Sequence, residues 1–429
     1  MQSVSSWGRL TRAPHDVVAL TDRSRAAAVV AASRQPALPF GNGRSYGDVC
    51  LNESGVLWST RDLDRFIAFD RSTGRLECEA GVTLDEIIEI ALPQGWFLPV
   101  TPGTRYVTLG GAIANDVHGK NHHGAGTFGE HVESLTLLRT DGRTIVCGPE
   151  READWFRATV GGLGLTGLIA TVTMRLRPVD GAWIDATATP FDSLAEFFAL
   201  SSAASTTHEY TVSWIDCGPA SGAEARGLFF AGRHSGSTEP APPARARAVP
   251  LTPPLSLVTP LSVRAFNRLY RRAHRHARQP ARQDYRRFFY PLDGVRDWNR
   301  IYGPRGFYQY QCVVPAAVQE DATRELLAMV AEAGTGSFLA VLKTFGERPP
   351  AGLLSFPMAG TTLALDFPNR GAETLALFGR LDAAVDAAGG RLYAAKDARM
   401  PAPLFKRGYP QWQAFEGYRD PGISSQMAR

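Results

Sequence analysis

The chain has 429 residues, of which 44% are hydrophobic and 21% are charged, and its formal net charge is +4. This length exceeds one ordinary hydrophobic core and predicts two or three domains, while no apolar run reaches the roughly 20 residues of a membrane-spanning helix. The N-terminus lacks the apolar segment of a signal peptide, and the five scattered cysteines form no CxxC pair, which argues against a disulfide framework. We therefore expect a cytoplasmic protein, and the small net charge gives no indication of nucleic-acid binding.

Residues 1–181 alternate short strands and helices. A helix is predicted at 22–34, and residues 74–100 indicate a strand, a helix that Thr83 and Glu86 begin as a capping box, and a second strand. Residues 131–149 indicate a hairpin with an Asp-Gly turn. Residues 158–179 indicate a glycine-rich turn and a long apolar strand. This pattern predicts the first domain.

The composition of the sequence changes after residue 181. Aromatic strands and two helices predict a second domain at 182–390, and residues 391–429 are predicted to return to the first domain. Residues 235–285 are rich in proline and arginine, and we expect a mobile segment there. Eight of the twenty residues at 268–287 are arginine. Two interpretations of this run stay open, a solvated loop and a contact with an anionic membrane surface.

Three glycine-rich segments stand out in the first domain. The first is "GNGRSYG" at 41–47, the second spans 101–131, and the third is "VGGLGLTGLI" at 160–169. The first segment fits neither the Rossmann nor the Walker A pattern, because its third glycine comes one place late and no GK[ST] follows. Repeated loops of small residues let backbone N–H groups approach an anionic ligand closely. They predict a cofactor that carries a pyrophosphate.

The second segment also holds a cluster of basic side chains, namely His118, Lys120, His122, His123 and His131. A metal site is disfavoured, because no cysteine accompanies the cluster and acidic residues are sparse there. The pattern favours one histidine that handles protons beside a cofactor, with the others in structural hydrogen bonds.

These motifs resemble a known family of flavoproteins. The pattern G-x-G-R-S-Y-G-D, the stretch "PGTRYVTLGGAIANDVHGKNHH" and "VGGLGLTG" are similar to the FAD-binding domain of vanillyl-alcohol-oxidase/p-cresol-methylhydroxylase-type enzymes. "YPLDGVRDWNRIYGPRGFYQYQCVVP", "FLAVLKTFG", "LLSFPMAG" and "GGRLYAAKDAR" resemble the decaprenylphosphoryl-ribose 2′-oxidase family within that group. The resemblance implies an α+β fold. It consists of a two-subdomain FAD-binding domain and a substrate domain built on an antiparallel sheet with flanking helices.

The resemblance also implies site residues. Those expected to bind FAD are Gly41, Asn42, Gly43, Arg44, Ser45, Tyr46, Gly47, Asp48, Gly103, Thr108, Leu109, Gly110, Gly111, Asn115, Asp116, Val117, His118, Ile169 and Tyr393. Those expected to contact substrate are Lys120, Tyr302, Gln309, Gln311, Lys343 and Ala364, with Lys396 and His118 as the catalytic residues. Many relatives in the wider group carry a flavin-linking histidine where Arg44 stands, so FAD is expected to bind non-covalently. The chain has four lysines and 42 arginines, and three of the lysines fall at these positions.

The implied reaction is FAD-dependent oxidation of the ribose C2 hydroxyl of a polyprenyl-phosphoryl-β-D-ribose to the 2-keto sugar. This is the first half of an epimerisation that an NAD(P)H-dependent keto-sugar reductase would complete. The proton acceptor is left open between His118 and Lys396. Two alternatives stay open, a sugar or alditol oxidase acting on a soluble substrate and a non-catalytic flavin-binding partner of a reductase. A peripheral position at the inner face of the cell membrane is a further expectation.

Overall fold

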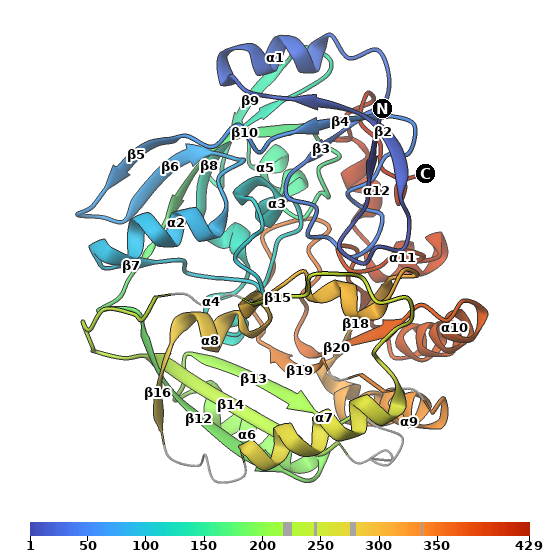
Figure 1. Ribbon diagram of the computed structural model, residues 1–429. Helices are drawn as coiled ribbons and strands as arrows, with labels where there is room; N and C mark the ends of the chain where they lie inside the picture. Colours follow the sequence, from blue (N-terminus) through green and yellow to red (C-terminus); the bar gives the residue numbers. More distant parts are fainter. Residues whose placement is uncertain (218–224, 244–246, 275–279, 335, 338) are drawn as a thin grey trace.

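The computed structural model describes the chain except for residues 218–224, 244–246, 275–279, 335 and 338. Three main sheets form its framework (Figure 1). The first has the order β1-β2-β4-β3, and its β2–β4 and β3–β4 pairs are parallel. The elements of this part are β1 (Gln2–Val4), β2 (Ala13–Ala19), α1 (Arg23–Ala31), β3 (Ala37–Phe40) and β4 (Val56–Ser59). Asp22 caps α1, within the predicted helix.

The second sheet has the order β5-β6-β10-β8-β9 and is antiparallel throughout. The predicted capping box of Thr83 and Glu86 begins α2, and Gly142, in the Asp-Gly turn of the predicted hairpin, has a φ of +82°. The elements of this part are β5 (Phe66–Asp70), β6 (Arg75–Glu79), α2 (Leu84–Ala91), β7 (Trp96–Phe97), α3 (Leu109–Ala114), α4 (His122–Ala125), β8 (Val132–Leu138), β9 (Thr144–Cys147), α5 (Ala153–Thr159), β10 (Leu168–Arg175) and β11 (Arg177–Pro178).

The third sheet has eight strands in the order β16-β12-β14-β13-β19-β20-β18-β21, and all its pairs are antiparallel. Its strands are β12 (Trp183–Phe191), β13 (Tyr210–Ile215), β14 (Gly227–His234), β16 (Ala281–Asp284), β18 (Phe307–Pro315), β19 (Ala340–Phe345), β20 (Gly360–Pro368) and β21 (Arg391–Leu392). Helices α6 (Leu194–Ser205), α9 (Gln319–Glu332) and α10 (Ala372–Ala387) pack on one face around a core that includes Phe197, Leu326 and Phe378. Residues on its other face, among them Gln309 and Gln311, line a cavity. The three sheets confirm the predicted α+β class.

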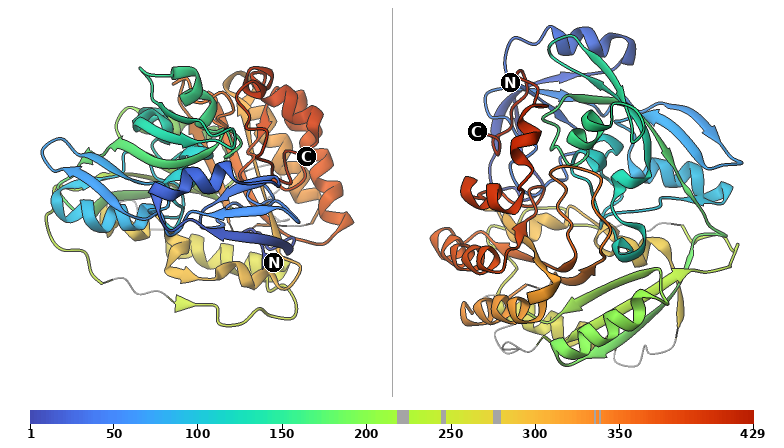
Figure 2. Two further views of the ribbon diagram at one scale, coloured as in Figure 1. Left: turned by 90° about the horizontal axis from the view of Figure 1, so that it is seen from above. Right: turned by 180° about the vertical axis from the view of Figure 1, so that it is seen from behind.

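The C-terminal segment runs back along the N-terminal strands. Helices α11 (Ala402–Gly408) and α12 (Trp412–Glu416) follow β21, and Phe415 and Ile423 share a core with Ala37 and Leu57. The Ser424 N–H donates to the Ala37 carbonyl at 3.0 Å. Figure 2 shows this red segment against the blue strands from two sides. The boundaries 1–181, 182–390 and 391–429 remain our proposed division.

The segment at 235–285, which we expect to be mobile, contains regular structure, and its mobility stays a prediction. Helix α7 (Pro260–Ala273) begins with Thr259 and Ser262 as a capping box and buries Val263 and Asn267. Strand β16 pairs with β12, and the short strand β15 (Arg247–Ala248) pairs with β17 (Val295–Arg296). Just before the arginine run at 268–287, Val263 and Asn267 lie four residues apart and give α7 a buried face, which composition alone does not reveal. Part of the run, residues 275–279, lies outside the described residues.

Three short helices complete the chain between β16 and β18, namely α8 (Tyr285–Phe289), η3 (Pro291–Gly294) and η4 (Trp298–Tyr302). Among the helices of the described residues, none has both the length and the apolar character needed to cross a bilayer.

Candidate active site

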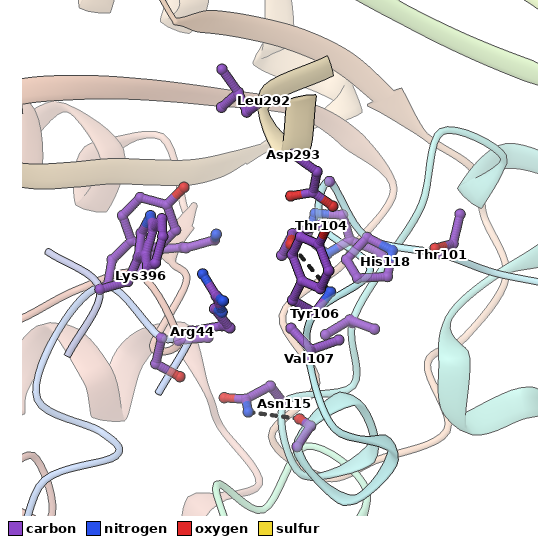
Figure 3. Close-up of a pocket in the computed structure, with 18 of the residues that line it drawn as sticks. Arg44, Thr101, Thr104, Tyr106, Val107, Asn115, His118, Leu292, Asp293 and Lys396 are labelled. Atoms are coloured by element: carbon purple, nitrogen blue, oxygen red, sulfur yellow. Dashed lines mark hydrogen bonds between the residues drawn. The ribbon is translucent and has the colours of Figure 1, made fainter. Parts of the chain in front are cut away.

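A cavity of about 930 Å³ lies between the glycine-rich segments of the first two sheets and the face of the third sheet opposite α6, α9 and α10. Most of the predicted site residues line it, and Figure 3 shows ten lining residues labelled around one open space. The predicted residues that line it are Gly41, Asn42, Gly43, Arg44, Ser45, Tyr46, Gly103, Thr108, Gly110, Gly111, Asn115, Val117, His118, Lys120, Ile169, Gln309, Gln311, Lys343, Ala364, Tyr393 and Lys396. The fold thus gathers side chains from positions 41 to 396 at one place.

Five predicted residues are absent from the cavity lining, namely Gly47, Asp48, Leu109, Asp116 and Tyr302. They support the wall from behind. Asp116 accepts hydrogen bonds from the Gly129 N–H and the Ser355 hydroxyl, and Tyr302 stacks on Phe307 with ring centroids 4.1 Å apart. A side chain at Gly47 would meet the Asp397 carbonyl oxygen at 1.6 Å. The motif therefore includes residues that shape the loop as well as residues that face the cavity.

The first glycine loop presents free backbone donors. Among the hydrogen bonds of the described residues, none uses the N–H groups of Asn42, Gly43, Arg44 or Ser45 as a donor. Gly43 has a φ of +57°, a conformation that glycine adopts at little cost. A Cβ at Gly41 would lie 2.4 Å from the Thr108 hydroxyl oxygen, so this loop and the second segment pack closely. Consecutive unpaired N–H groups beside a cavity form the kind of nest that binds a phosphate.

Arg44 is held beside this loop by aromatic rings. Its guanidinium carbon lies 4.3 Å from the ring centroid of Trp7 and 5.4 Å from that of Tyr106. Burial lowers the Arg44 pKa, and its Nε has no partner among the described residues. An arginine cannot form the histidyl link to a flavin, and a partly buried cation is suited to an anionic ligand.

The second segment supplies an opposite wall. Thr108 caps α3 by accepting from the Gly111 N–H at 3.2 Å, and the Tyr393 hydroxyl donates to the Asn115 carbonyl at 3.0 Å. The Asn115 Oδ1 is buried and has no partner among the described residues. Together with the amides of the first loop, this acceptor fits a large ligand that has both phosphates and polar ring edges, as FAD does. The residues present therefore fit FAD.

The histidine cluster separates into one cavity residue and three structural ones. His122 packs against Phe345 with ring centroids 4.4 Å apart. His123 and His131 contact the carbonyl oxygens of His208 and Ala125 through Nε2, at 3.1 and 2.9 Å. Within the described residues, no group of three or more His, Cys, Asp or Glu side chains is placed to hold a metal ion.

His118 lines the cavity as a neutral hydrogen-bond donor. Burial, with a smaller contribution from the Lys343 charge, lowers its pKa well below the usual value. Its Nε2 lies 3.2 Å from the amide nitrogen of Gln311, which must be the donor, so the imidazole proton belongs on Nδ1. This Nδ1–H is buried and has no partner among the described residues. It is available to donate to a ligand in the cavity.

Three of the four lysines line the same cavity. Burial lowers the pKa of Lys120 and Lys343 to about 7 each, and the pKa of Lys396 to about 8. The Lys343 Nζ lies 3.4 Å from the Gly119 carbonyl oxygen, and the Lys396 Nζ lies 3.9 Å from the ring centroid of Tyr46. Because these amines are only partly protonated near neutral pH, they can exchange protons as well as bind anions.

Asp366 is a buried carboxylate behind Lys396 that the sequence analysis missed. Gln309 donates to it at 2.6 Å, burial raises its pKa to about 7, and the Lys396 charge opposes that rise. Strand alternation offered a signal, because Asp366 shares the face of β20 that carries the predicted Ala364. Gln309 and Gln311 both line the cavity, while Tyr310 and Cys312 lie in the core on the other face.

Comparisons with known proteins agree with the cofactor that this geometry fits. The FAD binding domain family matches residues 14–148. The chain is 35% identical over 447 aligned residues to decaprenylphosphoryl-beta-D-ribose oxidase of Mycolicibacterium smegmatis, covering 99% of this chain and 96% of the relative. It is 34% identical to an uncharacterized Streptomyces coelicolor protein, over 81% of this chain and 99% of the relative. Mouse L-gulonolactone oxidase is 29% identical over 32% of this chain and 31% of the relative.

Proposed function

Because the chain belongs to the decaprenylphosphoryl-β-D-ribose oxidase family, we propose that it is a FAD-dependent oxidoreductase that oxidises the C2 hydroxyl of a polyprenyl-phosphoryl-β-D-ribose to the 2-keto sugar. The observation that carries this proposal is one cavity, in which the first glycine loop, a neutral histidine and three lysines of lowered pKa meet. FAD, bound non-covalently, supplies the hydride acceptor.

We assign the other roles in the reaction to residues of this chain. The Nε2 lone pair of His118 faces the Gln311 N–H, so His118 donates a hydrogen bond through Nδ1 to an oxygen of the substrate. Lys396, with a pKa of about 8, is the better proton acceptor for the C2 hydroxyl. The ammonium formed in this step is balanced by the Asp366 carboxylate, whose charge raises the Lys396 pKa. Lys120 and Lys343 provide positive charge for the substrate phosphate.

The proposal extends to partners that complete the epimerisation. A 2-keto sugar must be reduced from the opposite face to give the arabinose configuration, and we propose an NAD(P)H-dependent keto-sugar reductase for that step. A lipid-linked substrate also requires the enzyme to work at a membrane surface, and we propose peripheral contact with the inner face of the cell membrane.

The decisive experiment is anaerobic bleaching of the flavin absorbance near 450 nm by candidate substrates. Polyprenyl-phosphoryl-β-D-ribose is expected to bleach the band, and free pentoses or alditols are not. Bleaching by a free pentose or alditol alone would support a soluble-sugar oxidase, and no bleaching by any sugar would contradict an enzymatic role. Acid precipitation is expected to leave the flavin in the supernatant, because Arg44 cannot form the covalent link. A flavin mass adduct on the denatured chain would contradict that expectation.

A further inference from the structure

The exposed apolar side chains of this protein gather on one stretch of chain. Apart from Met1, every large apolar side chain more than half exposed among the described residues lies between 251 and 269. These are Leu251, Leu255, Leu257, Leu261 and Leu269, with exposures of 57–78%, and we call them the leucine patch. Single exposed leucines are common on protein surfaces, but five on one stretch indicate an interaction site.

Helix α7 carries two leucines of this patch on its outward face. Val263 and Asn267 are buried on the inward face, whereas Leu261 and Leu269 are exposed and eight residues apart. Arg264, Arg268 and Arg272 are exposed on the outward side as well. Among the ion pairs of the described residues, none involves these three arginines, whereas Arg271 pairs with Asp192. An outward face of leucine and arginine is typical of a helix that lies in a lipid interface.

The charged side chains of the segment around the leucine patch are all positive. Residues 240–283 contain nine arginines and no aspartate or glutamate. Such a segment attracts anionic lipid headgroups over about a Debye length, and its leucines can then enter the acyl boundary. A partner protein of ordinary mixed charge offers no comparable match.

The same helix borders the cavity of the active site. Tyr270 and His274, on the inward side of α7, are among the residues that line the cavity. Tyr270 contacts Trp214 of β13, with ring centroids 5.0 Å apart, and His274 contacts Phe230 of β14 at 5.9 Å. Figure 1 shows α7 along the strands β13 and β14, at the end of the molecule opposite α1. A surface that holds α7 against a bilayer would therefore bring the cavity to the lipid.

We propose that the leucine patch and the exposed arginines of α7 form a docking surface for an anionic phospholipid bilayer, which presents the lipid-linked substrate to the cavity. This inference rests on the proposed function, and it names the surface that contacts the membrane. It extends beyond the arginine run at 268–287, because four of the five leucines precede that run.

The test uses the full-length, FAD-loaded protein in a vesicle flotation assay. Vesicles of equal parts phosphatidylglycerol and phosphatidylcholine are compared with vesicles of phosphatidylcholine alone, at low and high salt. The wild-type protein is expected to float with the anionic vesicles. The double variant Leu261→Ser/Leu269→Ser is expected to bind at least about tenfold more weakly, and Arg264→Gln/Arg268→Gln/Arg272→Gln roughly a hundredfold more weakly at low salt.

Matched controls lie on other surfaces. Leu375→Ser changes a leucine that is 43% exposed on α10, and Arg25→Gln/Arg34→Gln changes two exposed arginines in or beside α1. Both controls are expected to float as the wild type does. Binding of the leucine and arginine variants at wild-type strength would overturn the proposal. A loss of self-association in these variants without a loss of vesicle binding would also overturn the proposal, because the leucine patch would then contact a second copy of the chain.

Activity separates this inference from the proposed function. All variants are expected to keep their FAD and to oxidise detergent-dispersed polyprenyl-phosphoryl ribose at the wild-type rate, since none of the changed residues lines the cavity. An enzyme that oxidises this substrate but ignores anionic vesicles would refute the docking surface alone. An enzyme that binds vesicles but never oxidises the substrate would refute the proposed function.

Discussion

Replacing Asp366 with asparagine is expected to shift the pH dependence of flavin reduction toward acid. The side chain is fully buried, and asparagine keeps its shape and can still accept the hydrogen bond from Gln309. The change removes one negative charge whose effect is to raise the Lys396 pKa. Without that charge, burial lowers the Lys396 pKa further below about 8.

The size of the shift follows from Coulomb's law. In general, two unit charges about 10 Å apart at an effective dielectric constant of about 20 interact by about 1.7 kcal/mol. This corresponds to about one pKa unit, so the pKa of Lys396 would fall from about 8 to roughly 7. At pH 7 the neutral fraction of the lysine would rise from roughly a tenth to roughly a half. The plateau rate is expected to fall about threefold, because a weaker base is a poorer proton acceptor.

Stopped-flow bleaching of the flavin by polyprenyl-phosphoryl ribose between pH 6 and 10 measures this shift. Asp382→Asn is the matched control, because Asp382 is also buried but accepts from Tyr310 and Arg399 on the other face of β18. The control is expected to keep the wild-type midpoint. A midpoint for Asp366→Asn that coincides with the wild-type value would refute the coupling between Asp366 and Lys396. A profile that falls with rising pH in both proteins would refute Lys396 as the proton acceptor.

Two further predictions concern packing and buried charge. Gly47→Ala is expected to destabilise the protein by about 1–3 kcal/mol and to reduce FAD retention, because the new Cβ would lie 1.6 Å from the main-chain oxygen of Asp397. Thermal melts and measurements of bound flavin test this. The control is Gly379→Ala, at an exposed helical site where a new Cβ has no neighbour within 4 Å. Lys343→Met is expected to flatten the pH dependence of apo-protein stability. The folded-state pKa of Lys343 is about 7, so between pH 7 and about 10 the unfolded chain binds more protons than the folded chain. The free energy of unfolding of the wild type therefore rises with pH in this range. Equal slopes of melting temperature against pH in the variant and the wild type would contradict this.

Local rules predicted much of the first domain because its signals lie close together in the sequence. The Thr83 capping box and the Asp-Gly turn each depend on residues within four positions, and both occur as expected. The glycine loop was likewise recognisable from its spacing, and its residues 41–46 line the cavity. The sequence did not separate residues that face the ligand from residues that support them. Gly47 illustrates this, because its need for glycine comes from Asp397, 350 positions away.

Two features depended on tertiary contacts that no local pattern expresses. Helix α7 was not predicted, because the nine arginines and many prolines of 240–283 indicate a loop. Its buried face consists of only Val263 and Asn267, which is too short a pattern to indicate a helix. Asp366 was hidden for a different reason. Its place in "ALDFP" suggests an ordinary strand end. Only the pairing of β20 with β18 puts Asp366 opposite Gln309, where its charge raises the Lys396 pKa. A buried carboxylate is costly unless its charge is used. The interaction of Asp366 with Lys396, a cavity lysine of lowered pKa, therefore supports the proposed proton transfer, rather than packing, as the reason for its burial.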